Sequence, residues 1–383
     1  MSSATGTFSN IPLQVPAKAR PGTHWVTAVV RASGLTAQKS FVVRTNWERR
    51  GFTPDNKRFN GYENVLNPFN VGSIDLHWSF FNYSRNLSSP AVANGVVYVR
   101  GGLVLYALDA STGANLWISW GTNEGSEVHS SPAVANGVVY VGTDYSSLLA
   151  IDARTGAMLW NFLARTPEDF SAYIESSPTV ANGVVYVGSV GNFFDENWGN
   201  VFTDGQVYAL NAKTGEELWS FPTNGAVISS PAVANGVVYV GSEDFNLYAL
   251  SARTGAKLWS YPTGAAVHSS PAVANGVVYV GSDDANVYAL NAHTGTKLWS
   301  FRTGKAVESS PAVANGIVYV GSDDGRVYAL DASTGLKLWS LRTSAPVISS
   351  PAVANGVVYV GSEDFNLYAL SARTGAKLWS YPT

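Results

Sequence analysis

The sequence predicts an all-β protein that forms a ring of four-stranded blades, a β-propeller, and three observations support this prediction. A stretch of twelve residues, Ser-Ser-Pro-Ala-Val-Ala-Asn-Gly-Val-Val-Tyr-Val, first occurs at 88–99 and recurs along the chain with few substitutions. Each recurrence is followed by short apolar runs that turn residues separate. A tryptophan marks the last apolar run of each repeat. Tandem units of this kind cannot bury an apolar face alone, so they pack on one another.

The repeat occurs seven times, and its proline gives the spacing. The prolines are Pro90, Pro132, Pro178, Pro231, Pro271, Pro311 and Pro351. Successive gaps are 42, 46, 53, 40, 40 and 40 residues. Helical solenoids repeat at similar periods, but no window shows apolar residues at the i, i+3, i+4 and i+7 positions that a helix requires. The period therefore predicts sheets of short strands.

The repeat at 269–303 shows how one blade is built. Its inner strand, Ser-Pro-Ala-Val-Ala, leads into Asn275-Gly276, and this dipeptide is typical of a tight hairpin because both residues tolerate positive φ. Val-Val-Tyr-Val-Gly is a second strand, and Ser-Asp-Asp-Ala-Asn is a polar turn. A third strand at 287–290 and a fourth at 297–301 flank the turn at 291–295. Four antiparallel strands result.

A tryptophan stands at a fixed distance after Thr-Gly in every repeat. The seven are Trp117, Trp160, Trp219, Trp259, Trp299, Trp339 and Trp379. A buried tryptophan covers roughly 150–250 Å². Aromatic side chains that recur at the repeat period belong to a core, so we expect each tryptophan to pack against the neighbouring blade.

The segment Ala-Leu-Asp-Ala-Ser-Thr-Gly-Ala-Asn-Leu-Trp, which ends at Trp117, resembles the tryptophan-docking motif of the pyrroloquinoline-quinone (PQQ)-like propeller repeats. All seven copies match, with the Asp replaced at Asn211, Ser251, Asn291 and Ser371, and the resemblance covers about 74–383. It implies the fold directly. It implies less about activity, because the family includes quinoprotein alcohol dehydrogenases and non-enzymatic scaffolds such as the outer-membrane assembly lipoprotein.

Composition excludes several classes of function. Hydrophobic residues make up 46% of the 383 residues and charged residues 13%, and the net charge of −3 indicates neither nucleic-acid binding nor an anionic-membrane surface. The absence of cysteine excludes disulfides and thiolate metal sites. It also excludes the vicinal cysteine pair that the resemblance would imply for a dehydrogenase. No apolar run is long enough for a membrane span, and 1–22 lacks the pattern of a signal peptide.

The chain divides into three parts by sequence. Residues 1–45 resemble the C-terminal half of a bacterial immunoglobulin-like module of exported proteins, residues 46–73 read as a polar lead-in loop, and residues 74–383 form the propeller. The resemblance to exported modules implies an extracellular, cell-surface or periplasmic protein whose signal peptide is not in this sequence.

One strand is left over in this arrangement. Asp75-Leu-His-Trp-Ser-Phe has the fourth-strand pattern, with Trp78 at the docking position, although the last repeat already has its own fourth strand. The ring is then either seven-bladed, or eight-bladed with the last blade completed by N-terminal strands. Strands around 24–32 and 41–44 could pack against 349–383 or mediate self-association, because unpaired strand edges recruit partners.

Two regions could bind a ligand. Every insertion lies in connections that share one face, at 118–131, 161–177 and 190–204, and variable loops on a rigid scaffold often carry function. Acidic groups beside aromatic rings suit a carbohydrate, a cationic protein segment or Ca²⁺, although such loops also simply pack their own aromatic side chains. The candidates for this ligand face are Glu168, Asp169, Asp195, Glu196, Trp198 and Asp204. The residue before each Ser-Ser-Pro should face the axis, which gives the candidate channel lining His129, Glu175, His268 and Glu308. Two His and two Glu in one channel could bind a metal, but no close-spaced ligand pair such as His-x-His occurs, so a polar lining is the favoured interpretation.

The sequence favours a non-catalytic, exported propeller that binds a protein or a carbohydrate, or acts as a scaffold, through the insertion face. No nucleophile–base arrangement, phosphate loop or zinc motif is present, so an enzyme is the less favoured hypothesis and no cofactor is expected. The alternative is a quinone- and Ca²⁺-dependent oxidoreductase of the quinoprotein dehydrogenase type.

Overall fold

A computed structural model describes residues 22–29, 36–43, 47, 51–60, 68–73, 76–80, 87–101, 104–120, 130–143, 147–164, 172–195 and 199–383. Side chains are described within these ranges except at 22–43, 120, 192–195 and 199–203. By its internal contacts the chain splits into two units, residues 1–45 with 62–65, and residues 46–61 with 66–383. In the first unit, β1 (Gly22–Val29) pairs antiparallel with β2 (Thr36–Val43). An immunoglobulin-like origin for this pair stays a prediction.

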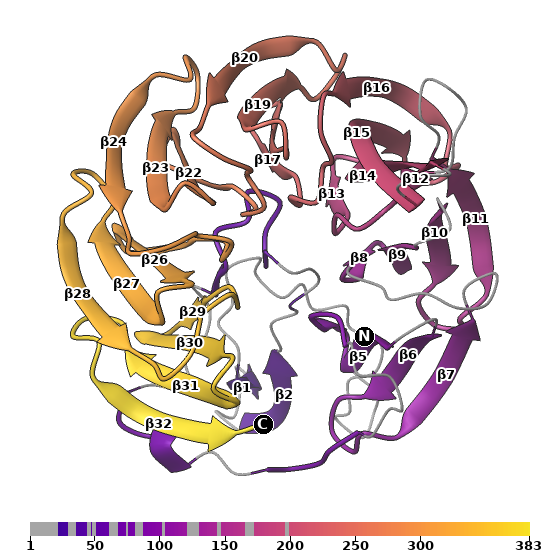
Figure 1. Ribbon diagram of the computed structural model, residues 1–383. Helices are drawn as coiled ribbons and strands as arrows, with labels where there is room; N and C mark the ends of the chain where they lie inside the picture. Colours follow the sequence, from indigo (N-terminus) through magenta and orange to yellow (C-terminus); the bar gives the residue numbers. More distant parts are fainter. Residues whose placement is uncertain are drawn as a thin grey trace. The chain divides into compact units, whose positions relative to one another are not determined.

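In the second unit the described strands form seven blades, which confirms the seven-bladed propeller (Figure 1). Blades 1 and 2 comprise β4 (Ala91–Ala93), β5 (Val96–Gly101), β6 (Val104–Asp109) and β7 (Asn115–Trp120), then β8 (Ala133–Ala135), β9 (Val138–Gly142), β10 (Ser147–Asp152) and β11 (Met158–Leu163). Blade 3 comprises β12 (Ala172–Tyr173), β13 (Thr179–Ala181), β14 (Val184–Asp195), β15 (Gly199–Asn211) and β16 (Glu217–Thr223). Blade 4 comprises β17 (Ala232–Ala234), β18 (Val237–Gly241), β19 (Asn246–Ser251) and β20 (Lys257–Pro262).

Blade 5 comprises β21 (Ala272–Ala274), β22 (Val277–Ser282), β23 (Asn286–Asn291) and β24 (Lys297–Arg302). Blade 6 comprises β25 (Ala312–Ala314), β26 (Ile317–Ser322), β27 (Arg326–Asp331) and β28 (Lys337–Arg342). Blade 7 comprises β29 (Ala352–Ala354), β30 (Val357–Ser362), β31 (Asn366–Ser371) and β32 (Lys377–Pro382), and the short β3 (Phe59–Asn60) pairs with its inner strand in parallel. A short 3₁₀ helix, η1, spans Val71–Ser73. No helix among the described residues has the length and apolar character to cross a membrane.

The turns follow the dipeptides that predicted them. Asn275 and Gly276 have φ of 52° and 77°, both in the left-handed region that the tight hairpin between β21 and β22 requires. The turn between β23 and β24 closes with Gly295 at φ 73°, whose N–H donates to Asn291 O at 2.8 Å. Local sequence therefore sets the hairpins of each blade.

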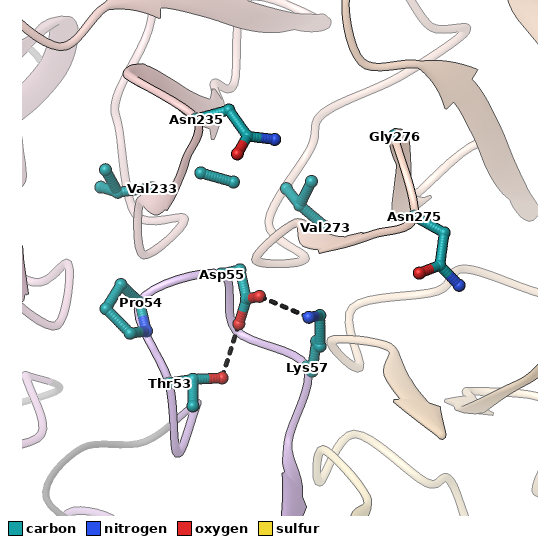
Figure 2. A pocket seen from close by; sticks show the side chains of 10 residues that line it. Thr53, Pro54, Asp55, Lys57, Val233, Asn235, Val273, Asn275 and Gly276 are labelled. Carbon is teal, nitrogen blue, oxygen red and sulfur yellow. Dashed lines mark hydrogen bonds and ion pairs between the residues drawn. The ribbon is translucent and has the colours of Figure 1, made fainter. Parts of the chain in front are cut away.

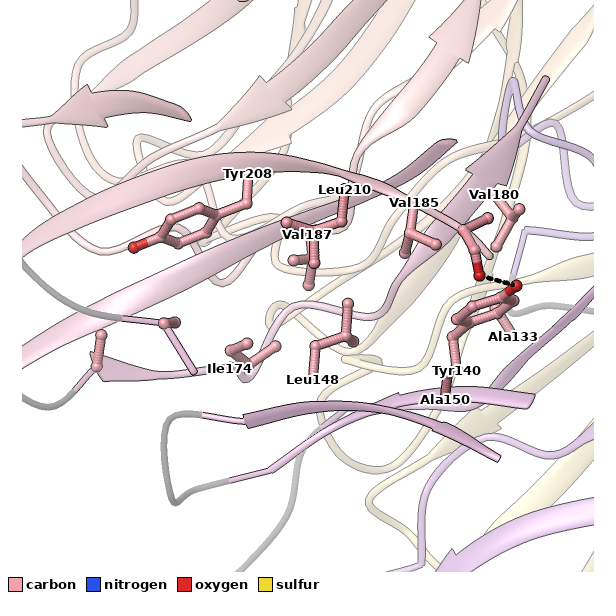
Figure 3. Packing of buried hydrophobic residues seen from close by; sticks show 13 residues of the cluster. Ala133, Tyr140, Leu148, Ala150, Ile174, Val180, Val185, Val187, Tyr208 and Leu210 are labelled. Atoms are coloured by element: carbon pink, nitrogen blue, oxygen red, sulfur yellow. Dashed lines mark hydrogen bonds between the residues drawn. The ribbon is translucent and has the colours of Figure 1, made fainter. Parts of the chain in front are cut away.

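Packing between blades uses the recurring tryptophan. The Trp299 indole Nε1 donates to Ala332 O of the following blade at 3.0 Å, and its ring covers Gly335, where an added Cβ would lie 2.7 Å from the ring. Figure 3 shows the core cluster between blades 2 and 3, where Leu148, Ile174 and Leu210 are fully buried. Each blade thus buries an apolar face only by contact with the next.

Residues 51–60 run past the inner strands of blades 4 to 7 and satisfy backbone groups at their edges. The four hydrogen bonds are Val233 N to Pro54 O (2.7 Å), Val273 N to Asp55 O (2.8 Å), Val313 N to Lys57 O (2.9 Å) and Val353 N to Arg58 O (2.8 Å). Buried strand edges need such partners, because an unpaired buried N–H is costly. From the sequence, this segment was predicted only as part of a polar lead-in loop.

The insertion at 190–204 continues two strands of blade 3. Asn192 pairs with Phe202 and Asp195 with Gly199, so most of the insertion extends the β14–β15 hairpin. The short strand β12 pairs with its base at Val190 and Gly191. The second and third strands of blade 3 are therefore longer than those of the other blades, on the face that the insertions share.

Candidate functional site

Two kinds of connection meet at one face of the propeller. The turn between the second and third strands of each blade lies at the same face as the connection that leads into the inner strand of the next blade. His268 and Glu308 lie in such connections, before β21 and β25, while Glu243 and Asp283 follow β18 and β22. The topology thus brings acidic turn residues beside the predicted channel-lining residues.

His268 lies between two carboxylates of neighbouring blades. Its Nε2 is 2.9 Å from Glu243 Oε1, and its Nδ1 is 2.9 Å from Asp283 Oδ2. These two hydrogen bonds, Asp283 first, raise the pKa of His268 from its usual 6.5 to about 10. The imidazole is therefore a cation at neutral pH, held between two carboxylates.

Two further carboxyl groups of the cluster do not have such a counterion. Burial raises the pKa of Glu308, and the nearby charges of Asp323 and Asp283 raise it further, while His268 lowers it. Burial also raises the pKa of Asp323, with contributions from Asp283 and Glu363 that Lys305 opposes. Like charges in a partly buried site disfavour ionisation, so a bound cation would relieve this repulsion.

The cluster has the donor atoms of a site for a hard cation. One ligand atom each of His268, Asp283 and Glu308 lie within 4.8 Å of one another. The buried oxygens Asp283 Oδ1 and Asp323 Oδ1 accept no hydrogen bond within the described part of the chain. Since His268 is protonated, its ring offers no lone pair, and the carboxylates of Asp283, Glu308 and Asp323 are the ligands available. Carboxylate oxygens suit Ca²⁺ and related cations.

The second acidic residue of each turn has a structural role instead. Asp284 Oδ2 accepts hydrogen bonds from Tyr288 Oη at 2.6 Å and from Gly264 N at 2.7 Å, and its Oδ1 accepts from Asn286 N. Asp244 and Asp364 make the matching bonds in blades 4 and 7. In each Asp-Asp or Glu-Asp pair, only the first residue belongs to the cluster.

The structure brings two of the predicted site residues together and leaves others apart. His268 and Glu308 belong to the cluster, and Glu175, partly buried, precedes the inner strand of blade 3. Asp204 is partly buried on β15, and Asp195 ends β14, where its side chain is not described. Four predicted residues, His129, Glu168, Asp169 and Glu196, lie outside the described residues, as does Trp198. A ligand site on the insertion face therefore stays a prediction.

Sequence reasoning missed Glu243, Asp283, Asp323 and Glu363, because each stands in a stretch that reads as a polar turn. A signal was available. Each is the first acidic residue after the Gly-Ser that ends the second strand, at the period of the repeat. That position lies at the face shared with the residue before Ser-Ser-Pro, where His268 and Glu308 stand.

A cavity of about 440 Å³ lies where residues 53–57 meet the inner strands of blades 4 and 5 (Figure 2). Thr53 donates to Asp55 Oδ1 at 2.5 Å, and Lys57 Nζ is 2.7 Å from Asp55 Oδ2, so these charges are paired within the segment (Figure 2). The Asn-Gly turns at 235 and 275 place this cavity at the face opposite to the acidic turns. The carboxylate that lines this cavity, Asp55, is paired with Lys57, so its lining has no group of carboxylates like the one around His268.

The chain resembles oxidoreductases in its sequence. Lupanine 17-hydroxylase [cytochrome c] of Pseudomonas sp is 28% identical over 212 residues, which are 51% of this chain and 29% of that protein. Quinohemoprotein alcohol dehydrogenase ADH-IIG of Pseudomonas putida is 28% identical over 189 residues, 46% of this chain and 25% of that protein. The matched stretch therefore spans less than a third of these curated relatives.

These relatives overturn two expectations. We expected a non-catalytic protein without a cofactor, but the relatives are named as a hydroxylase and as dehydrogenases, with a cytochrome or a quinone in their names. The expectation is therefore wrong, and the oxidoreductase alternative is favoured. Sequence reasoning failed here because it sought a catalytic motif in one segment, whereas His268, Asp283 and Glu308 come from connections and turns 15 to 40 residues apart.

Solved structures share the fold. Quinohemoprotein alcohol dehydrogenase ADHIIG from Pseudomonas putida superposes with a TM-score of 0.77 at 21% identity, over 88% of this chain and 72% of that chain. A europium-containing methanol dehydrogenase gives 0.76 at 17% identity, over 88% and 85%. BamB from Moraxella catarrhalis gives 0.62 at 18% identity, over 77% and 88%.

The repeats themselves match one family model along most of the propeller. The model, described as outer membrane protein assembly factor BamB, matches residues 73–194, 203–310 and 283–383. The tryptophan docking, the seven four-stranded blades and this match agree. The chain belongs to the PQQ-like family of β-propeller repeats that this model describes.

Proposed function

We propose that this chain is the propeller of an oxidoreductase that holds a cation and a quinone cofactor at the acidic cluster around His268. The observation that carries the proposal is that the partly buried carboxyl groups of Glu308 and Asp323, whose pKa values burial and neighbouring carboxylates raise, share one face with Asp283. The quinone- and cytochrome-linked names of the curated relatives support it.

The residues present fit a hard, multivalent cation. Glu308, in the connection before β25, and Asp323, in the turn after β26, would supply carboxylate oxygens. Asp283 Oδ1 is a buried oxygen that accepts no hydrogen bond among the described residues. His268 does not bind the cation. Its ring orients Glu243 and Asp283 beside the site through bonds of 2.9 Å.

A bound quinone would supply the redox chemistry, because it accepts the two electrons and two protons that leave a primary alcohol as it becomes an aldehyde. The residues of this chain would bind the cofactor, orient it and balance its charge. The extended β14–β15 hairpin lies on the face that the insertions share, and we infer that substrate or a protein partner approaches from this face. An exported location agrees with the description of the family model as an outer membrane protein assembly factor.

The experiment combines binding with turnover. The protein is mixed with pyrroloquinoline quinone and CaCl₂, and quinone binding is followed by equilibrium dialysis while a primary alcohol and a redox dye report oxidation. We expect binding that requires the cation and falls at least ~10-fold in Glu308→Gln, about 1.4 kcal/mol of binding energy. Glu216→Gln is the matched control, since Glu216 is exposed in a Thr-Gly turn at the opposite face.

The two readouts separate the parts of the proposal. Quinone binding without dye reduction would support the cofactor site and would contradict the proposal that the substrate is a primary alcohol. Folded protein that binds no quinone with or without Ca²⁺ would contradict the proposal as a whole.

A further inference from the structure

Charged side chains of blades 4 to 7 are sorted between the two faces of the propeller. Nine of the ten acidic residues between 224 and 383 lie in the turns after the second strands or in the connections between blades, at the face of the His268 cluster. The exception is Asp331, in the turn that leads into β28. We call the opposite face, which holds the Asn-Gly hairpins and the Thr-Gly turns, the Thr-Gly face.

Basic residues are concentrated at the Thr-Gly face of these four blades. Each fourth strand begins with an exposed lysine soon after its Thr-Gly turn, and the turns of blades 4 and 7 add an exposed arginine. None of these side chains forms an ion pair with a carboxylate of the described residues. The six residues, which we call the basic rim, are Arg253, Lys257, Lys297, Lys337, Arg373 and Lys377.

Few carboxylates oppose the charge of the basic rim, because most of its turns begin with a neutral residue. The first residue of the Thr-Gly turn is Asp in blades 1, 2 and 6 but Ser or Asn in blades 4, 5 and 7. In blade 6, Asp331 Oδ1 accepts hydrogen bonds from Ser333 N at 3.0 Å and from Thr334 N at 2.9 Å, so it is engaged within its own turn. The net charge of −3 predicted no attraction to an anionic membrane, but it averages over two faces of opposite character.

Exposed leucines accompany the lysines of blades 4 to 6. Leu258, Leu298 and Leu338, each directly after a lysine, are 53%, 51% and 50% exposed. Leu336, directly before Lys337, is 67% exposed. Lysine can lay its aliphatic stem along apolar surface while its ammonium group stays in a polar layer. This combination suits the boundary between water and hydrocarbon.

The repeat places these groups at one level of the ring. Blades 4 to 7 follow one another at 40 residues without insertions, so the four lysines hold the same position in β20, β24, β28 and β32. These strands lie at the outer edge of their blades (Figure 1). A flat surface can therefore contact all four lysines at once, whereas a narrow polymer would reach fewer of them.

We propose that the basic rim, together with the exposed leucines beside it, docks this protein on a bilayer that contains anionic lipids. The phosphate groups of the lipids bind the ammonium and guanidinium groups, and the leucines enter the interfacial layer. Each basic residue near such a surface adds attraction that salt weakens. The His268 cluster then faces away from the membrane. The proposal is independent of the oxidoreductase function.

The test measures binding of the full chain to lipid vesicles by co-sedimentation. EDTA is present throughout, so that no divalent cation bridges the acidic face to the lipid. Vesicles of phosphatidylcholine alone are compared with vesicles of which about a third is phosphatidylglycerol, at about 50 mM and about 500 mM NaCl. We expect binding to the anionic vesicles at low salt, at least about tenfold weaker binding at high salt, and little binding to neutral vesicles.

Two double variants of the same strands provide a matched comparison. Lys297→Gln with Lys337→Gln removes two charges from the basic rim, whereas Arg302→Gln with Arg342→Gln removes two from the exposed opposite ends of β24 and β28. We expect the lysine pair to lower the partition coefficient about 30-fold and the arginine pair to change it less than about twofold.

A third double variant tests the apolar part of the surface. Leu298→Ser with Leu338→Ser keeps every charge of the basic rim, and we expect it to lower the partition coefficient about tenfold. Both leucines are half exposed, so the variant should fold, which circular dichroism would check.

Three outcomes would overturn the proposal. The first is the absence of binding to anionic vesicles at low salt. The second is an equal loss of binding in the lysine and arginine pairs, which would show that only the net charge matters. The third is a leucine pair that binds the vesicles as well as the parent, while soluble heparin displaces the protein from them, which would assign the basic rim to a soluble polyanion.

Discussion

The paired tryptophans Trp259 and Trp379 allow the energy of blade docking to be measured within one local sequence. Trp259 donates its indole N–H to Ala292 O at 3.1 Å and covers Gly295, where an added Cβ would lie 2.7 Å from the ring. Truncating a buried tryptophan to alanine costs about 3–5 kcal/mol. Trp379 is partly buried against the cluster of Val71, Val357 and Ala369 and stacks on Tyr381, so we expect its loss to cost about 1–2 kcal/mol, as for a half-buried aromatic side chain.

The assay is urea denaturation of Trp259→Ala and Trp379→Ala, followed by far-ultraviolet circular dichroism, with hydrogen exchange to show which blades open first. We expect the midpoint to fall at least twice as far for Trp259→Ala. Phenylalanine at each site is the control, because it restores most of the apolar area without the N–H donor. Equal losses at the two positions would refute the reasoning, since they would show that packing against the Val71 cluster stabilises the protein as much as docking on the next blade.

Two further predictions follow from particular contacts. His268→Gln should be less stable than the parent below about pH 6.5, and the difference should shrink as pH rises to about 10. The pKa of His268 is raised in the folded protein by Asp283 and Glu243, so its stabilisation is complete below the unfolded value and lost as the folded group deprotonates; a difference that is constant from pH 6 to 10 would contradict this. Asn56→Gly should cost about 1–3 kcal/mol of unfolding free energy, because buried Asn56 donates to Pro231 O at 3.0 Å. An unchanged denaturation midpoint would show that residues 51–60 add no stability.

Most of the propeller could be predicted because its rules are local. The Asn-Gly and Thr-Gly dipeptides fix the turns through positive φ at residues such as Asn275 and Gly295, and the tryptophan period fixes how blades pack. Residues 51–60 could not be predicted. Their contacts with Val233, Val273, Val313 and Val353 are bonds between backbone atoms, which leave no pattern in the side chains.

Only part of the candidate site could be predicted from the sequence. The position before Ser-Ser-Pro was expected to line the channel, and His268 and Glu308, which stand there, lie in one cluster, while their role as a channel lining stays a prediction. Asp283 and Asp323 were missed, because Ser-Asp-Asp reads as a polar turn in blades 5 and 6 and only the fold shows which of the two carboxylates points away from Tyr288 or Tyr328. The packing of Val71 on blade 7 could not be read from a sequence that this blade shares with blade 4.

Cation binding to the cluster tests our central claim most directly. Eu³⁺ luminescence reports both affinity and the number of water molecules that remain on the ion, and Ca²⁺ competes for the same oxygens. We predict one strong site that loses water ligands on binding, is displaced by Ca²⁺, weakens at least ~10-fold in Glu308→Gln, and fades at acidic pH, since the pKa values of Glu308 and Asp323 are raised. Luminescence that keeps the full set of water ligands, or that is the same in Glu308→Gln as in the parent, would contradict the claim.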